Sequence, residues 1–420
     1  MNKIRKTITI LGIGIAAGIV GLFLVYMLPV RPMQDNLKET LAEFMSEGEN
    51  PFLLTGYKGS SLDNLTDAIM LGNAVYENDM SFWQSAMRNA RASDVKDFPM
   101  EALEQYLISG ESEEKTEYAR YWHGYLVILK PLLLLFNYNQ IRIINGCTQF
   151  GLILWILHEL RKRNMKCGMV AYVFSILSMF PMTLPYSLQF SSMFYTGNIA
   201  LLLILKNHEK WKQEEKHNYF FLIVGMCTSY LDFLTYPLFT FGMPMVMCLV
   251  LNKYCSLKDR VCFLLKNGIT WGTGYAFMWA GKWVAGSLIT GENLLSSALG
   301  VASFRMSGQA YDESLNRIMA ILRNGYIYFN LAGVILAAAV LIWIFVFVWK
   351  KRDTLNAEEL LPLGMAACMP FLWYLVIANH SYTHYWYTFR ALAVSVFALA
   401  MIPECIGSKT MEMERAGKGI

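Results

Sequence analysis

Apolar runs of roughly 18 to 23 residues recur along this chain, and short clusters of charge separate them. Each run is long enough to cross about 30 Å of hydrocarbon as an α-helix. A helix satisfies its own backbone hydrogen bonds, as a segment surrounded by lipid must. Charged residues make up 16% of the chain, whereas a soluble globular domain carries about 25%. The sequence therefore predicts an all-α, polytopic membrane protein.

The first run, Thr7–Leu28, follows a basic start. It is longer than the core of a cleavable signal peptide, and no obvious small-x-small cleavage site follows it. We therefore expect a retained signal-anchor helix. Gly14 and Gly18 form a small-xxx-small pair that could pack against a neighbouring helix, although such a pair can also be incidental.

The positions of lysine and arginine predict how the spans are oriented. Two apolar stretches, Tyr125–Phe136 and Ile141–Leu160, are separated by only a few residues. If only the second crosses, every later basic cluster lies on one side of the membrane. Because lysine and arginine are enriched in cytoplasmic loops, we interpret Tyr121–Phe136 as an outer-surface helix kinked near Pro131. Both termini are then cytoplasmic in a multi-pass protein of the cytoplasmic membrane.

This interpretation gives about ten spans and two long outer loops, which usually hold function or a folded subdomain. The spans are expected near residues 7–29, 141–160, 167–185, 188–206, 218–233, 235–252, 265–287, 328–349, 359–378 and 389–405. The parts of the chain are a signal-anchor at 1–29, an extracytoplasmic loop at 30–140, spans at 141–287, a second loop at 288–327, spans at 328–405 and a cytoplasmic tail at 406–420.

Helices are also expected inside the first loop. An apolar stripe at helical spacing covers Leu37–Met45. Ser60–Asp63 has the pattern of a cap that opens a helix over Asn64–Ala74, and Asp97–Pro99 opens another helix that ends near Ile108.

Three acids in this loop are candidate catalytic bases. Asp35 lies shortly after the first span, where a carboxylate could deprotonate an acceptor that approaches from outside. An acid favoured by the N-terminus of a helix is the plainer explanation. Asp63 and Asp67 have the i, i+4 spacing that places both carboxylates on one helical face, either solvated or bridged by a cation. A divalent cation is the one cofactor that the sequence suggests.

Basic and aromatic residues near the span ends are candidate substrate contacts. Arg120, Tyr121 and His123 precede the surface helix, which carries Lys130, and Arg142 opens the second span. Arginine and histidine can hold a phosphate, and aromatic rings stack on sugar faces. An interfacial aromatic belt with snorkelling cations explains the same residues.

A second group of candidates lies in the later outer turns and loop. Asp232 is a lone carboxylate between two spans, and Arg305 and Arg390 are candidate partners for it. His380 and His384 are spaced to face one ligand. Because zinc would need further ligands, an anion is the favoured ligand, with an interfacial belt as the alternative.

Cysteine usage and charge argue against other classes of protein. The eight cysteines lie in or beside apolar runs and form no CxxC pair, so we expect neither a disulfide framework nor a cysteine-based metal site. The net charge of +4 comes from basic residues at membrane ends, and nucleic acid is not an expected partner.

The arrangement resembles the GT-C superfamily of membrane glycosyltransferases, with a large outer loop after the first span and an arginine at the start of the second. Many of those enzymes have a His-Pro-Pro-Leu segment before an Arg-Leu span. Here His123-Gly-Tyr-Leu126 and Ile141-Arg-Ile143 stand in those places, and no Asp-Glu pair follows the first span. The resemblance implies Asp35 as the base. It implies phosphate contacts at Arg142, Arg305 or Arg390.

Nearly the whole chain is also similar to a group of bacterial, mainly Gram-positive, multi-pass membrane proteins without an assigned activity. The segments that carry this likeness are Asp63–Leu71, Arg120–Gly124, Gln189–Tyr195, Asp232–Pro237 and Asn379–Arg390.

The favoured expectation is an inverting glycosyl transfer on the extracytoplasmic face, from a polyprenyl-phosphate-linked sugar to a glycan, lipid or protein acceptor. One alternative is a transporter or flippase for lipid-linked cell-envelope intermediates, for which Lys282 is the main mid-membrane candidate. Another is an assembly subunit without activity. Membrane lipids are expected partners in each case.

Overall fold

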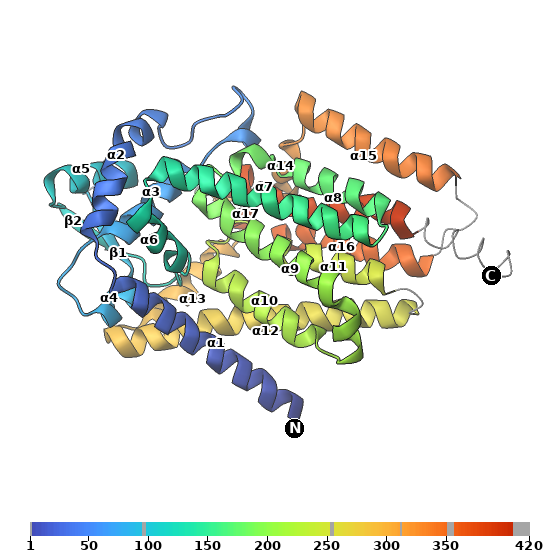
Figure 1. Cartoon of the computed structure of the whole chain (residues 1–420), viewed down its shortest axis with the longest axis horizontal. Coiled ribbons are helices and arrows are strands. Elements are labelled where there is room, and N and C mark those ends of the chain that lie inside the picture. The colour runs from blue at the N-terminus through green and yellow to red at the C-terminus, as the bar shows by residue number, and fades with distance from the viewer. Residues whose placement is uncertain (1, 95–97, 253–255, 311–312, 351–356, 406–420) are drawn as a thin grey trace.

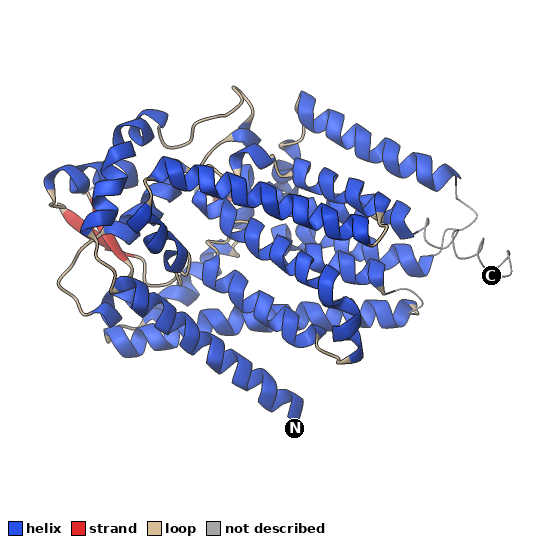
Figure 2. Ribbon diagram, in the orientation of Figure 1, coloured by secondary structure: helices blue, strands red, loops and turns tan. Residues whose placement is uncertain are grey.

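The computed structural model describes residues 2–94, 98–252, 256–310, 313–350 and 357–405, and the expected tail at 406–420 lies outside these ranges. Within them the fold is mostly helical (Figure 2). The long helices run roughly side by side, with the first loop at one end of the bundle (Figure 1). We call this end the loop end. The opposite end, where the described chain ends, is called the terminal end.

The elements follow the chain in two groups. The first loop contains α2 (Arg31–Glu47), η1 (Lys58–Ser60), α3 (Asn64–Val75), α4 (Phe82–Arg88), β1 (Ala90–Ser93), α5 (Pro99–Ser109), β2 (Glu114–Glu117) and α6 (Leu126–Leu135). The bundle and its connections contain α1 (Asn2–Tyr26), α7 (Tyr138–Lys162), α8 (Lys166–Ser178), η2 (Pro181–Thr183), α9 (Leu188–Gln213), α10 (His217–Leu231), α11 (Leu238–Leu251), α12 (Leu257–Thr290), α13 (Leu294–Arg305), β3 (Gln309–Ala310), β4 (Glu313–Ser314), α14 (Arg317–Tyr326), α15 (Leu331–Lys350), α16 (Ala357–Val376), α17 (Ala378–Thr383), α18 (Tyr385–Thr388), η4 (Phe389–Leu392) and α19 (Ala393–Ala400).

Six segments of the described chain are long and apolar enough to cross a membrane. They are Lys3–Tyr26, Tyr138–Lys162, Leu188–Gln213, Leu331–Lys350, Glu358–Val376 and Tyr385–Cys405. Several long apolar helices confirm the predicted class of helical membrane protein, while the number of ten spans and their orientation stay predictions.

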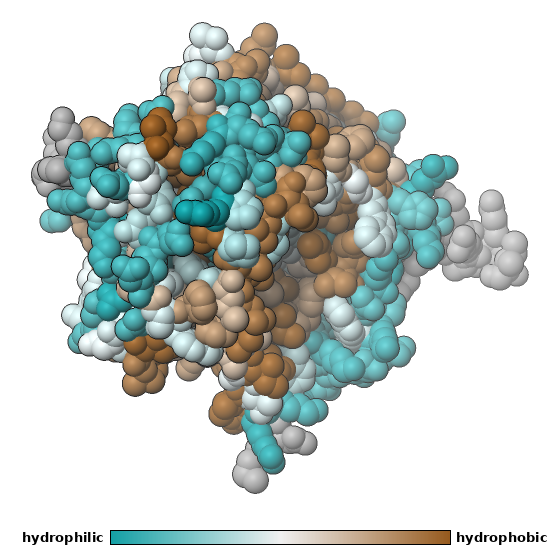
Figure 3. All heavy atoms as spheres, turned by 60° about the vertical axis from the view of Figure 1, so that its left-hand side comes forward, coloured by the Kyte–Doolittle hydropathy of each residue, from teal (hydrophilic) through white to brown (hydrophobic). Residues whose placement is uncertain are grey.

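The surface agrees with a membrane setting. Apolar side chains form a broad area between hydrophilic regions in the space-filling view (Figure 3). On α15, for example, Leu341 is 67% exposed and Phe345 is 61% exposed. A soluble protein rarely exposes large contiguous apolar area, and lipid is the solvent in which such a helix face is stable.

Three helices of the first loop lie where the sequence predicts them, whereas α4, β1 and β2 were not predicted. Leu37 and Leu41 on α2 are buried, as expected from the apolar stripe. Asp63 caps α3 by accepting a hydrogen bond from the backbone N–H of Thr66. Pro99 occupies the first turn of α5, where the missing N–H costs no helical hydrogen bond.

The segment interpreted as a surface helix is short. The helix α6 has 10 residues and contains Pro131. At 1.5 Å per residue this is about 15 Å, roughly half of the hydrocarbon thickness. Its length agrees with a helix that does not cross, and it packs on α2 and α3 of the first loop.

The glycine pair of α1 is a packing contact. A Cβ atom at Gly14 would lie 2.0 Å from the Met226 side chain, and one at Gly18 would lie 3.0 Å from the ring of Tyr230. Tyr230 also donates a hydrogen bond to the carbonyl of Gly18 at 2.9 Å. The small residues therefore let α1 lie against α10, as the spacing suggested.

Candidate functional site

Six charged or imidazole side chains gather at the loop end from segments far apart in the sequence. Several of them lie near the same side chain, Tyr387, because the charges of Asp63, Asp232 and Arg305 all act on its phenol. We call the set the loop-end cluster, and its members are Asp63, Asp232, Arg305, His380, His384 and Arg390.

Asp63 has one occupied oxygen and one free oxygen. Its Oδ1 accepts the N–H of Thr66 at 3.1 Å, and its own N–H donates to Oγ of Ser187 at 3.0 Å. Its Oδ2 is buried and has no hydrogen-bond partner in the described ranges. Burial raises the pKa of the Asp63 carboxyl to about 6, against the hydrogen bonds from Thr66 and the charge of Arg390. The residue is 2% exposed, so its free oxygen faces the interior of the protein.

Asp232 repeats this arrangement in the turn between α10 and α11. Its Oδ1 accepts the backbone N–H of Thr235 at 2.9 Å and the hydroxyl of Thr235 at 2.5 Å. Its Oδ2 is buried and unpartnered among the residues that the structure describes. Burial raises the pKa of this carboxyl to about 6 as well. Arg305 and Arg390, suggested as partners from the sequence, form no ion pair with it in this part of the chain.

The imidazoles link this turn to α13. His380 hydrogen-bonds the carbonyl of Leu234 through Nε2 at 2.8 Å, while its Nδ1 is buried without a partner in the described chain. Leu234 has a φ of 64°, which a branched side chain rarely adopts, so this contact holds a strained turn. Arg305 Nη1 lies 3.2 Å from Nε2 of His384. Burial and the charge of Arg305 lower the pKa of His384 to about 4, so both groups can be adjacent without repulsion.

The two arginines of the cluster differ in how many of their N–H donors have a partner in the protein. Arg390 is 0% exposed, lies over the ring of Phe190, and donates to Oγ1 of Thr183 at 2.7 Å. Arg305 is half-buried, and within the described ranges its side chain makes one hydrogen bond, to His384. The Nε atoms of both arginines lack a partner among the described residues, but both terminal nitrogens of Arg390 are bonded to the protein. Arg305 is therefore the cation of the cluster with more donors left for a ligand.

Aromatic rings surround these groups. Tyr121 packs edge-on against Trp279 at 5.0 Å between ring centroids and lies 5.7 Å from Phe233. Tyr387 stacks with His384 at 5.2 Å. Tyr121 and Tyr387 are themselves buried, so these rings help to exclude water from the polar groups.

Asp67 and Arg142 serve a different arrangement, which we call the interlock. Asp67 accepts a hydrogen bond from Tyr138 at 2.5 Å and from the N–H of Leu188 at 2.9 Å, at the N-terminus of α9 where an anion is favoured. Arg142 donates to both carboxylate oxygens of Glu47, at 2.6 and 3.0 Å.

The interlock leaves little capacity for a substrate. Arg142 also donates to Asn64 at 2.9 Å and to the carbonyl of Tyr186 at 3.1 Å. These bonds fasten α2 and α3 of the first loop to α7 and α9. Asp67 and Arg142, both predicted site residues, therefore lie in a satisfied buried network and not among the unpartnered groups.

Two further candidates have protein partners. The two ring nitrogens of His123 lie 2.9 Å from the hydroxyl of Tyr125 and 2.9 Å from the carbonyl of Tyr118. Lys130 donates to the carbonyl of Ala74 at 2.6 Å. These side chains hold the first loop together.

The remaining two lie elsewhere in the loop. Arg120 is half-buried over the ring of Tyr118, and its Nε has no partner within the described residues. Asp35 is exposed on α2 and forms no ion pair or hydrogen bond to its side chain in the described part of the chain. The structure therefore brings Asp63 into the cluster and leaves Asp35 outside it.

Two residues near the loop end that the sequence did not single out have features of a site. Gln189, in the first turn of α9, is buried with an unpartnered Nε2 as far as the structure describes the chain. Tyr387 joins the imidazoles to the carboxylates, as described above. The signal that could have found Gln189 is an amide at the loop end of an otherwise apolar helix, where burial is costly.

The groups that could hold a metal ion are not those expected. Among the described residues one group of three or more ligands is present, His208, His217 and Cys248, far along the bundle from the cluster. Asp63 and Asp67 have no third ligand beside them in this set. Chain folding brings Cys248 next to two histidines that are distant in sequence, a group that could hold an ion, and the expectation that no cysteine takes part in a metal site stays a prediction.

Comparison of the chain with protein-family models, curated proteins and solved structures finds no match in any of the three.

Proposed function

We propose that this protein transfers a sugar from a polyprenyl-phosphate carrier to an acceptor hydroxyl or amine at the loop end. The observation that carries the proposal is the pair of half-satisfied carboxylates, Asp63 and Asp232, which share a neighbour, Tyr387, with Arg305 and its unpartnered Nε. A buried polar atom without a partner costs roughly 1–3 kcal/mol. A substrate that supplied those partners would remove the cost, so the arrangement favours a polar ligand.

In this proposal Oδ2 of Asp63 takes the proton from the acceptor. The acceptor atom forms a bond to the anomeric carbon, the bond from that carbon to the phosphate oxygen breaks, and the phosphate leaves with the electron pair. A single displacement inverts the anomeric centre. A carboxyl with a pKa of about 6 is ionised at neutral pH and is still a stronger base than an ordinary aspartate, which suits it to the role.

Arg305 supports the leaving group. A guanidinium can bind phosphate through two parallel N–H donors, and such bonds strengthen as negative charge develops in a site that excludes water. His384 accepts from Arg305 and orients it. Arg390 is buried and acts through its positive charge, which stabilises the ionised form of Asp63.

The other polar groups suit the sugar. Asp232 and His380 each offer a free acceptor atom, and sugar hydroxyls are donors. Tyr121 and Tyr387 are aromatic neighbours of these groups. The lipid chain of the carrier would lie along the apolar helix surfaces that meet the site.

The transporter alternative has less support. Its main candidate, Lys282, is buried and donates to the carbonyl of Met87 at 2.9 Å, in the first loop. The charge therefore lies at the loop end and not midway along the bundle, where a transport site is expected.

The function is tested with purified protein in lipid nanodiscs, a radiolabelled polyprenyl-phosphate sugar and candidate acceptors, comparing the unmodified chain with Arg305→Gln. A charge-assisted hydrogen bond is worth about 1.5–3 kcal/mol, so we expect the KM for the carrier to rise about 10- to 100-fold.

Arg317→Gln is the matched control, because this exposed arginine donates to backbone carbonyls of Leu375 and Met306. It is expected to keep the KM within about twofold of the parent. Carrier binding without sugar transfer or carrier hydrolysis, across a panel of acceptors, would reject the enzyme and leave a carrier-binding protein.

The pH dependence follows from Asp63. Because its pKa is raised to about 6, the base is ionised above that pH and protonated below it. We expect kcat/KM to be flat from pH 7 to 8 and to fall about tenfold per pH unit below pH 6. The profile is measured at saturating acceptor. Asp232→Asn should keep this acid limb, whereas loss of the limb in that variant would name Asp232 as the base.

A further inference from the structure

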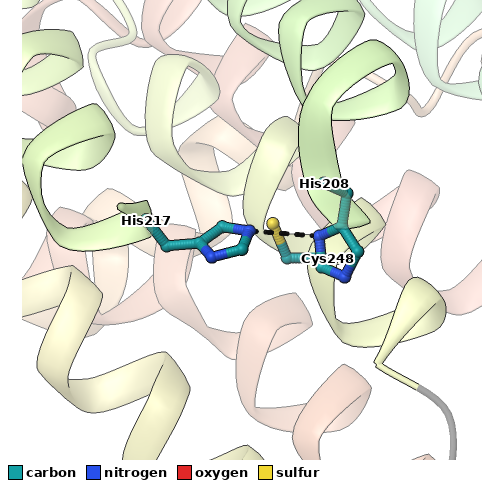
Figure 4. Close-up of side chains that lie close together, drawn as sticks. All are labelled: His208, His217 and Cys248. Atoms are coloured by element: carbon teal, nitrogen blue, oxygen red, sulfur yellow. Dashed lines mark hydrogen bonds between the residues drawn. The ribbon is translucent and has the colours of Figure 1, made fainter. Parts of the chain in front are cut away.

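Three side chains from three helices meet near the terminal end of the bundle (Figure 4). They are His208 of α9, His217 at the start of α10, and Cys248 of α11. One ligand atom from each lies within 4.8 Å of the other two, and all three residues are buried, at 0%, 5% and 0% exposure. The group is far from the loop-end cluster, so the proposed sugar transfer does not explain it.

The two imidazoles are already at the spacing of metal ligands. Nε2 of His217 lies 3.2 Å from Nδ1 of His208. Two nitrogens bound to one tetrahedral ion at 2.0–2.1 Å are about 3.3 Å apart. Coordination therefore needs little movement of either ring, and the thiol of Cys248 faces the gap between them (Figure 4).

The structure also offers the surroundings of a metal site. The second nitrogen of His208, Nε2, is buried and makes no hydrogen bond of good geometry within the described residues, and the side chain of Asn252 lies beside it. An outer partner of this kind commonly orients a metal-bound histidine. A cavity of about 430 Å³ is lined by His217 and Asn252, so it reaches the group at one of its three ligands.

We propose that His208, His217 and Cys248 bind one zinc ion, which fastens the ends of α9, α10 and α11 together. A thiolate with two imidazoles selects a soft or borderline ion and disfavours magnesium and calcium, which require oxygen ligands. On binding, the thiol of Cys248 loses its proton to solvent. The proton now shared between the rings moves to a nitrogen that does not bind the ion, and a water from the cavity completes four-coordination.

The test measures metal bound to the full-length protein, purified in detergent after expression with added zinc. Mass spectrometry of the metal content is expected to give about one zinc per chain. Replacement by Co²⁺ is expected to give a thiolate-to-cobalt charge-transfer band. Cys248→Ala should remove this band and reduce the bound zinc at least tenfold, and Asn252→Ala should weaken binding about tenfold.

Cys227→Ser is the matched control, since this exposed cysteine also lies in the bundle, on α10, and should leave the stoichiometry unchanged. Measurements on the unmodified chain alone can overturn the zinc proposal. Less than about a tenth of an equivalent of zinc after loading, or a cobalt complex without the thiolate band, would overturn the proposal. Binding of copper(I) but not zinc would also overturn it.

Discussion

Asp63→Asn is expected to lower kcat for sugar transfer by about 10²- to 10⁴-fold, the contribution of a positioned general base. The substitution keeps the shape of the side chain. The amide Oδ1 can still accept the N–H of Thr66, so the cap of α3 survives. The effect is read as single-turnover rate with the carrier saturating, which separates chemistry from binding.

The same substitution should stabilise the fold at neutral pH. The pKa of Asp63 is about 6 in the folded chain, above the ordinary value of 3.8, so ionisation opposes folding once the pH exceeds that range. The stability from the neutral carboxyl is fully present below pH 4 and is lost as the pH rises through 6. Asparagine never ionises, and we expect it to raise the free energy of unfolding by about 2–3 kcal/mol at pH 7 and by almost nothing at pH 4.

Loss of activity with a gain in stability distinguishes a base from a structural residue, whose removal would lower both. Asp35→Asn provides the comparison, because Asp35 is exposed and the resemblance to GT-C enzymes named it as the base. We expect Asp35→Asn to change kcat for sugar transfer by less than twofold. If Asp35→Asn stops transfer while Asp63→Asn does not, the assignment of Asp63 is wrong.

Local features of the fold could be predicted from the sequence. Apolar run length predicted the helical membrane class, cap chemistry predicted the start of α3 at Asn64, and a proline in the first turn predicted the start of α5 at Pro99. These depend on residues within a few positions of each other. The break of the last apolar run into α18, η4 and α19 was not predicted, because Arg390 is buried by tertiary contacts that no local pattern contains.

The residue types of the candidate site could be predicted from the sequence, but not which residue has which role. Asp63 and Asp67 looked equivalent, four positions apart on one helix. The structure separates them, since Asp67 is satisfied by Tyr138 and Leu188 while Asp63 keeps a free oxygen. The partners that decide this are more than seventy residues away in sequence. The same holds for Cys248, whose two histidine neighbours belong to other helices.

Arg142→Gln is expected to lower the free energy of unfolding by about 3 kcal/mol. Removing one partner of a buried ion pair leaves the other charge uncompensated, which typically costs 3–5 kcal/mol. The lower figure applies because the side chain of Glu47 is 25% exposed and water can reach it. Since the interlock fastens the first loop to α7 and α9, hydrogen exchange in α3 should speed up more than in α11.

A double variant decides whether the uncompensated charge of Glu47 causes the loss of stability in Arg142→Gln. Glu47→Gln with Arg142→Gln removes both charges, so we expect it to be more stable than Arg142→Gln alone by at least 1 kcal/mol. Arg161→Gln, at the exposed opposite end of the same helix α7, should change stability by less than about 0.5 kcal/mol. If Arg142→Gln behaved like Arg161→Gln in denaturant titrations, the first loop would be held by its apolar contacts alone.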